Sequence, residues 1–226
     1  LKYAKVPVVS APFGMALGGG CEFSIHADAV NAYAETYMGL VEIGVGLLPA
    51  GGGTKELCIR AVDLASKYNT DVQPFIFKHF EQIAMAKVSM GAAELYDMSY
   101  MREGDSITMD IDRLIGDAKQ KVLGLAANYR PKLRRTDIKA PGRGIAASIK
   151  SQLWNMKMGN FITEYEYEMA TEIAKALCGG DVNPGTIITE DYLLQLEREL
   201  FLKLCGNKKT AERVQHMLKT GKPLRN

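Results

Sequence analysis

The sequence of 226 residues lacks the patterns that mark several common protein classes. Its four cysteines, Cys21, Cys58, Cys178 and Cys205, form no Cys-x-x-Cys pair and fit no zinc-ligand spacing, and its three histidines are scattered. No signal peptide is visible, and no apolar run reaches the roughly 20 residues that a membrane-spanning helix needs. We therefore expect a cytoplasmic protein with reduced, core-filling thiols, no metal ligands and no membrane span.

The sequence also lacks a large excess of positive or negative charge. The formal net charge of +2 is too small to argue for nucleic acid as a partner. Basic residues gather in Arg130–Arg135 and again at Lys219, Lys222 and Arg225. We interpret both groups as solvated loop and tail charges, with contact to an anionic ligand such as a phosphate as the alternative. Hydrophobic residues make up 47% of the chain, which predicts a packed core in one large domain or two modest ones.

The first sixty residues alternate between strand and helix patterns. Apolar runs at 6–11 and 29–34 predict strands, and each is followed by glycines and a predicted helix, over 19–27 and 54–62. This order predicts an α/β fold.

After about residue 63 the pattern becomes mainly helical. Predicted helices cover 89–98, 109–127, a stretch after the capping box Thr163-x-x-Glu166, a stretch opened by Thr189, and 210–220. Ser89 is a candidate N-cap, and 128–144 is interpreted as a linker or exposed loop. We predict two domains, residues 1–130 and a helical module at 131–226 that could serve oligomerisation.

Two glutamates in apolar, glycine-rich settings are the strongest chemical signal. Glu22 follows Gly18–Gly20, and Glu42 lies between Val41 and Ile43, in a stretch with no other charge from Thr36 to Thr54. Burial of a carboxylate is costly and raises its proton affinity, which suits acid–base chemistry near neutral pH.

Each half of this signal has a structural alternative. Glu22 in a first helical turn also suits the helix dipole, and glycines also allow close helix–strand packing. The glycine run lacks the phosphate-loop and dinucleotide spacings, so its backbone N–H groups are interpreted as oxyanion donors. Asp28 and Glu35 look solvated and are left out of the candidate site.

The same residues resemble a known family. The run Pro7–Glu22 closely resembles the crotonase (enoyl-CoA hydratase/isomerase) signature, which continues through Met38–Glu42, Gly46–Pro49 and Gly52–Thr54. The resemblance covers about residues 6–62 strongly, with a weaker echo in Lys87–Asp97. It implies the C-terminal half of a crotonase-type ββα spiral core followed by a mainly α-helical C-terminal module.

The resemblance implies a role for each matching residue. Glu22 would activate the water that adds to the β-carbon of a 2-enoyl-CoA, and Glu42 would deliver a proton to the α-carbon. The N–H group of Gly19, next to Gly18, would bind the thioester oxygen, while Pro49 and Ala50 would line the substrate. Ala50 stands where the family usually has glycine, which bears on water placement. The implied function is 2-enoyl-CoA hydration in fatty-acid β-oxidation.

The resemblance also implies a longer protein. Residues Thr189–Asn226 are similar to the C-terminal tail of bacterial 3-hydroxyacyl-CoA dehydrogenases that carry a fused crotonase domain. The family's N-terminal half, which supplies the other oxyanion amide and most of the coenzyme A pocket, is expected outside this chain. We therefore expect the isolated chain to be inactive and to assemble as a homo-oligomer.

The resemblance implies no cofactor for hydration itself, since coenzyme A enters as part of the thioester substrate. NAD would belong to a dehydrogenase domain outside the chain. The alternatives are an enoyl-CoA isomerase, which often keeps only one glutamate, and a non-catalytic structural or oligomerisation module.

Overall fold

The computed structural model describes residues 1–226. By contacts, the chain divides into two units whose parts alternate along the sequence: Leu1–Leu40 with Val88–Arg134, and Val41–Lys87 with Arg135–Asn226. The predicted division into residues 1–130 and 131–226 stays a prediction. None of the helices combines the length and apolar character needed to cross a lipid bilayer.

The first unit is built on short parallel strands. β1 (Val9–Ser10), β3 (Ala29–Tyr33) and β5 (Ser106–Thr108) form one sheet in the order β1-β3-β5. β2 (Gly14–Leu17) pairs in parallel with β4 (Thr36–Gly39). Parallel strands need a crossover between them, and the residues between β1 and β3 supply one that contains a helix.

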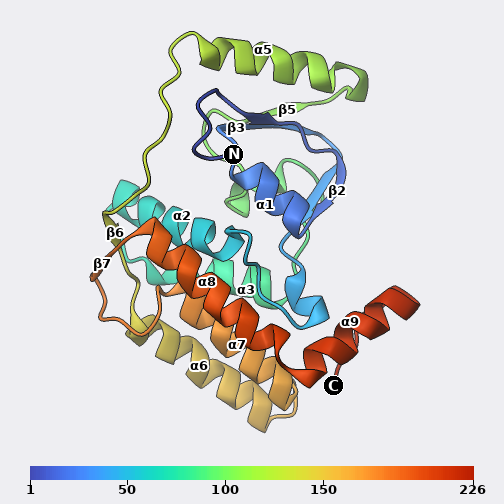
Figure 1. Ribbon diagram of the computed structural model, residues 1–226, viewed down its shortest axis with the longest axis vertical. Coiled ribbons are helices and arrows are strands. Elements are labelled where there is room, and N and C mark those ends of the chain that lie inside the picture. Colours follow the sequence, from blue (N-terminus) through green and yellow to red (C-terminus); the bar gives the residue numbers. More distant parts are fainter. The chain divides into compact units, whose positions relative to one another are not determined.

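Helices cover these strands. α5 (Leu114–Ala126) packs on β1 and β3, and α1 (Gly19–Ile25) packs on β2 and β4 (Figure 1). α4 (Glu94–Asp97) and the 3₁₀ helix η2 (Ile111–Arg113) complete the unit.

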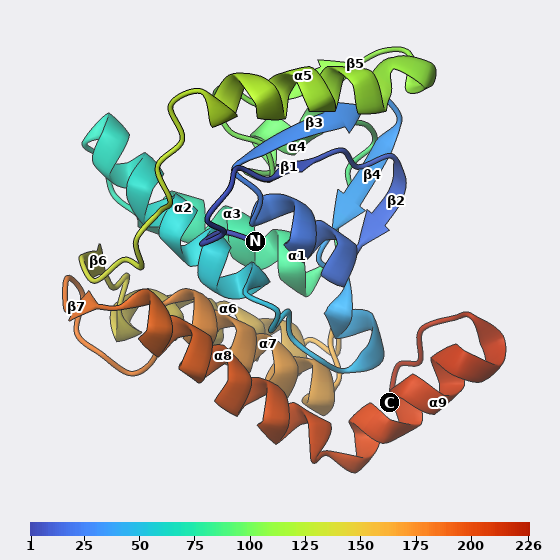
Figure 2. The ribbon, with the colours of Figure 1, turned by 45° about the horizontal axis from the view of Figure 1, so that its top comes forward.

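The second unit is mainly helical. It begins with the 3₁₀ helix η1 (Glu42–Val45), and a two-stranded antiparallel ribbon joins β6 (Ile138–Lys139) to β7 (Ile187–Ile188). The remaining elements are helices: α2 (Gly53–Tyr68), α3 (Gln73–Ala84), α6 (Arg143–Met158), α7 (Glu164–Leu177), α8 (Glu190–Cys205) and α9 (Lys208–Thr220). α7 lies between α6 and α8 and also packs on α2 and α3 (Figure 2).

Two helices of this unit begin at caps that the sequence predicts. Thr163 and Glu166 make the reciprocal capping box: the Thr163 hydroxyl accepts the Glu166 N–H at 3.1 Å, and the Glu166 carboxylate accepts the Thr163 N–H at 2.8 Å. Thr189 caps α8 by accepting the Tyr192 N–H at 3.0 Å. Each of these two helices, α7 and α8, has a buried apolar face, made of Tyr165, Met169, Ile173, Leu177, Leu193, Leu196, Leu200 and Leu204.

Two local predictions about loops and caps are wrong. Residues 128–144 are not an exposed linker throughout, because they contain β6, where Ile138 is fully buried, and the start of α6. Ser89 is not a helix cap: its hydroxyl accepts the Met38 N–H at 2.9 Å and contacts the Thr36 carbonyl at 3.2 Å. The hydroxyl is directed at backbone groups of β4, and α4 begins only at Glu94, five residues further on, so Ser89 is not positioned to cap that helix.

Two predictions about environment are also wrong. Cys205 is exposed, whereas the other three cysteines are buried as expected. Asp28 is not solvated, because its side chain is 5% exposed and accepts from the Val8 N–H at 2.9 Å and the Tyr129 hydroxyl at 3.1 Å. Lys132 adds an ion pair at 3.0 Å, so this carboxylate is a structural anchor of the first unit.

Candidate functional site

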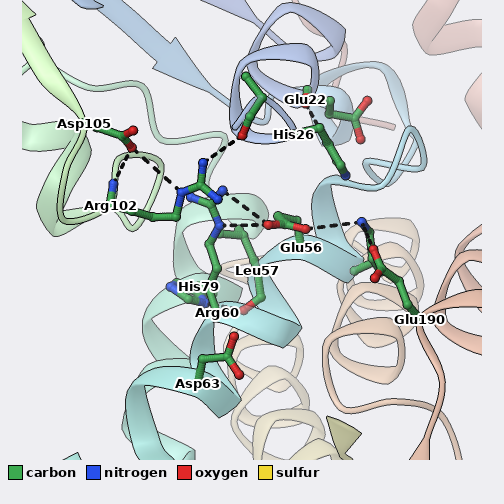
Figure 3. A network of polar contacts seen from close by, with 12 residues as sticks. Glu22, His26, Glu56, Leu57, Arg60, Asp63, His79, Arg102, Asp105 and Glu190 are labelled. Carbon is green, nitrogen blue, oxygen red and sulfur yellow. Dashed lines mark hydrogen bonds and ion pairs between the residues drawn. The ribbon is translucent and has the colours of Figure 1, made fainter. Parts of the chain in front are cut away.

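Glu22 lies in the first turn of α1, in the first unit. It is 8% exposed, which is unusual for a carboxylate. Its N–H group donates to the Gly18 carbonyl at 3.0 Å, and its own carbonyl contacts the ring nitrogen Nδ1 of His26 at 2.6 Å (Figure 3). The backbone of Glu22 is therefore fixed at both its amide and its carbonyl.

A glycine turn precedes Glu22. Gly18 has φ 54° and ψ −120°, and its N–H donates to the Gly39 carbonyl at 2.8 Å, which ties the turn to β4. Gly19 and Gly20 are exposed, and a side chain added at Gly19 would meet nothing within 4 Å. The first N–H groups of a helix have no partner inside the helix, so this turn presents amide donors without steric cover.

The far end of α1 is held from another part of the first unit. Arg102 donates to the carbonyls of Ala27 at 2.8 Å and Asp28 at 3.1 Å. Asp105 accepts the Arg102 N–H at 2.7 Å and the Val30 N–H at 2.8 Å, which joins this loop to β3. The short helix that bears Glu22 is thus fixed at both ends.

Glu42 opens η1, in the second unit, and is half-buried. The turn closes on itself: the Gly46 N–H donates to Ile43 at 3.0 Å, and the Leu47 N–H donates to the Glu42 carbonyl at 3.1 Å. Gly46 ends the turn in a left-handed conformation with φ 87°. The 3₁₀ turn therefore sets the direction in which the chain leaves Glu42.

Pro49 and Ala50 follow in the same unit, directly before α2. Pro49 is buried, and its carbonyl accepts the fully buried Thr54 hydroxyl at 2.8 Å, while Ala50 is half-buried. The structure thus groups Gly18, Gly19 and Glu22 in the first unit. It groups Glu42, Pro49 and Ala50 in the second. The catalytic and binding roles of these six residues stay predictions.

A buried charge network in the second unit was missed by sequence reasoning. The Lys55 ammonium contacts Glu190 at 2.8 Å and Glu56 at 3.2 Å, and Arg60 contacts Glu56 at 3.3 Å (Figure 3). All four side chains are at most 7% exposed. The two glutamates that meet Lys55 lie 1 and 135 positions away from it in sequence, so no local pattern announces the network.

The structure contains no cluster of side chains of the kind that binds a metal ion. No group of three or more histidine, cysteine, aspartate or glutamate side chains is arranged to hold a metal ion. The buried His79 uses Nδ1 to contact the Leu57 carbonyl at 3.0 Å, and burial lowers its pKa to about 4. This histidine is therefore a neutral structural residue at physiological pH.

Comparison with known proteins matches the part of the chain that carries the glutamates. Residues 1–66 match the family model described as enoyl-CoA hydratase/isomerase. The chain is similar to the crystal structure of carnitinyl-CoA hydratase from Mycobacterium avium, with a TM-score of 0.53 and 16% identity. That similarity covers 96% of this chain and 62% of the other. It shows that the fold is of the crotonase type, and the mixed α/β fold class is confirmed.

Full-length relatives are much longer than this chain. It is 44% identical over 227 residues to a Bacillus subtilis (strain 168) protein named "Probable 3-hydroxyacyl-CoA dehydrogenase", covering 100% of this chain and 28% of that protein. It is 27% identical to a Rickettsia felis protein whose name includes "fatty acid oxidation complex trifunctional enzyme", covering 97% of this chain and 27% of that protein. The chain thus spans little more than a quarter of these relatives. Its resemblance to the crotonase superfamily is confirmed.

Proposed function

We propose that the protein hydrates 2-enoyl-CoA thioesters to 3-hydroxyacyl-CoA in fatty-acid oxidation, with Glu22 and Glu42 as its acid–base pair. The observation that carries the proposal is the family match over residues 1–66, which spans both glutamates and the glycine turn. The burial of Glu22 and the fixed turns around both glutamates support it.

The proposed reaction adds water across the Cα–Cβ double bond of the thioester. Glu22 orients a water molecule and accepts one of its protons while the oxygen bonds to the β-carbon. Glu42 delivers a proton to the α-carbon. Acid–base groups of this kind typically contribute about 10²–10⁴-fold each to the rate.

The thioester oxygen gains negative charge as the β-carbon is attacked. The uncovered N–H group of Gly19 is the proposed donor to this oxygen, since it is exposed at the start of α1. One donor of this type lowers the barrier by roughly 3–4 kcal/mol in other enzymes. An enolate stabilised by such a donor is the species that Glu42 then protonates.

We propose this activity for a longer protein that contains the chain. The chain covers 28% of the length of the Bacillus subtilis relative, whose name adds a dehydrogenase activity. The second oxyanion donor, most coenzyme A contacts and an NAD-dependent dehydrogenase domain are accordingly assigned to sequence outside these 226 residues. The isolated chain is expected to form oligomers with turnover at or near background.

The loss of absorbance of crotonyl-CoA in the full-length protein tests the proposal. Glu22→Gln and Glu42→Gln are each expected to slow hydration by at least 100-fold. Glu35→Gln is the matched control, because Glu35 is exposed and lies in the same unit as Glu22. Undiminished rates in both site variants would rule out the assignment.

The same preparation separates the alternatives. Conversion of a 3-enoyl-CoA to a 2-enoyl-CoA without hydration would identify an isomerase. Absence of turnover with both substrates, together with a defined oligomer in light scattering, would identify a structural module.

A further inference from the structure

Two hydroxyl groups from the C-terminal helices meet one carbonyl oxygen beside Glu42. The Thr210 hydroxyl, on α9, donates to the Gly46 carbonyl at 3.0 Å. The Tyr165 hydroxyl, on α7, reaches the same oxygen at 3.4 Å and also contacts the Thr210 hydroxyl. All of these residues belong to the second unit.

Gly46 is the residue that ends the turn bearing Glu42. Its N–H closes η1 on Ile43, and the next N–H, of Leu47, returns to the Glu42 carbonyl at 3.1 Å. A change in the orientation of the Gly46 peptide therefore shifts the hydrogen bond that fixes the Glu42 backbone. The two hydroxyls therefore contact the Gly46–Leu47 peptide, which is the peptide that hydrogen-bonds back to the Glu42 carbonyl.

The contact is close and buried. A Cβ atom at Gly46 would lie only 3.0 Å from the Thr210 Cα and 3.3 Å from the Arg213 Cδ. Tyr165, Thr210 and Arg213 are each less than 5% exposed. The Arg213 guanidinium stacks 5.3 Å from the centre of the Tyr165 ring, which holds the ring in place.

Burial also favours the donor form of the tyrosine. It raises the pKa of Tyr165, so its hydroxyl keeps its proton throughout the physiological range. A protonated Tyr165 donates to Thr210 or Gly46, and Thr210 in turn donates to Gly46. Buried hydrogen-bond chains of this kind are rigid because each member has no alternative partner in water.

We propose that Thr210 and Tyr165 are positioning residues for Glu42, acting through the Gly46 carbonyl, an inference that rests on the proposed function. Neither residue is assigned a contact with substrate. Their role is to restrict the η1 turn so that the Glu42 carboxylate keeps one direction during proton delivery. Misplacement of a catalytic group by about 1 Å can cost roughly 100-fold in rate.

Hydration kinetics of the full-length protein test this role. Thr210→Val keeps the side-chain shape and removes the hydroxyl, and it is expected to lower kcat about tenfold with KM unchanged. Thr210→Ser restores the hydroxyl and the rate. Thr220→Val is the matched control on α9, because the Thr220 hydroxyl bonds only within its own helix and tail.

A double variant separates positioning from general folding. In a Glu42→Gln background, Thr210→Val is expected to cause no further loss, because the group being positioned has already been removed. An equal tenfold loss in both backgrounds would mean that Thr210 supports the fold only, and would overturn the inference. So would an unaltered kcat in Thr210→Val when Glu42→Gln is impaired.

Amide hydrogen exchange tests the same contacts without measuring activity. We call the hydrogen bonds from Thr210 and Tyr165 to the Gly46 carbonyl the clamp. Exchange at the Gly46 and Leu47 N–H groups is expected to speed up about tenfold in Thr210→Val and Tyr165→Phe, and to return to normal in Thr210→Ser. Wild-type exchange in both variants would refute the clamp whatever the activity. A fully active Glu42→Gln protein would instead refute the proposed function, and exchange would still report on the clamp.

Discussion

Glu190→Gln is a sharp test of the buried charge network in the second unit. Glu190 is fully buried and lies 2.8 Å from the Lys55 ammonium, which is itself 2% exposed. The amide keeps the size and one acceptor oxygen of the carboxylate but removes its charge. The substitution therefore leaves a buried ammonium with one fewer counter-charge.

The structure bounds the loss of stability. Removal of one partner from a buried ion pair costs about 3–5 kcal/mol, because the other charge is left uncompensated. Lys55 keeps the Glu56 carboxylate at 3.2 Å, which places the expected cost at the lower end, about 3 kcal/mol. Glu190 also opens α8, where its negative charge favours the helix dipole, so its loss adds to the cost.

Urea unfolding followed by tryptophan fluorescence reports this loss. Trp154 is the single tryptophan of the chain and lies in α6, in the same unit as the network. For a denaturant slope of about 2 kcal/mol/M, a loss of about 3 kcal/mol lowers the urea midpoint by about 1.5 M.

The matched control is Glu199→Gln, on the exposed side of α8. Glu199 accepts only from Gln195, one turn earlier, so its substitution is expected to change the stability by less than about 0.5 kcal/mol. Equal midpoints for Glu190→Gln and Glu199→Gln would refute the argument. The double variant Lys55→Met/Glu190→Gln should lose less stability than the two single variants lose in sum, because the ammonium left uncompensated by Glu190→Gln is then absent. A loss larger than that sum would also refute the argument.

Two further predictions concern the same unit. Burial lowers the pKa of His79 from its ordinary value of 6.5 to about 4. Between these two pH values, the unfolded chain therefore binds a proton at His79 that the folded chain does not bind. The free energy of unfolding should then fall by about 3 kcal/mol between pH 6.5 and 4. Urea titrations across that range check this, and His79→Gln should lack that component. Gly142→Ala should destabilise by more than about 2 kcal/mol in urea unfolding, because Gly142 has φ 85° and a Cβ would lie 2.4 Å from the Pro184 nitrogen. Gly144→Ala, two residues on in α6 with no atom within 4 Å, should instead stabilise by about 0.5–1 kcal/mol.

Helices with their own stop and start signals could be predicted from the sequence. The capping box at Thr163, the cap at Thr189 and the glycines Gly179 and Gly180 each act on neighbouring backbone groups, so their effect is local. Glu22 and the glycine turn were readable for the same reason, since the helix start and the donors are contiguous in sequence.

Elements whose signal depends on distant partners were missed. β2 (Gly14–Leu17) has Met15 81% exposed and no apolar alternation, and it becomes a strand by pairing with β4. Tertiary pairing outweighed local propensity in this strand. α3 (Gln73–Ala84) was missed as well, although its buried residues Ile76, His79 and Ile83 recur at helical spacing.

The same separation applies to the environment of Glu42. The match to the family model ends at residue 66, yet the two hydroxyls that contact the turn bearing Glu42 come from the far end of the second unit. Thr210 lies 164 positions from Gly46, and Glu190 lies 135 positions from Lys55. Such contacts form only after long loops have closed, so they contribute to the final geometry and not to any local pattern. A function assigned from the matched segment alone would therefore take Glu42 into account, but not the helices whose hydroxyls contact its turn. Substitutions at the two hydroxyls of α7 and α9 should be judged by the same kinetic criteria as substitutions beside the glutamates.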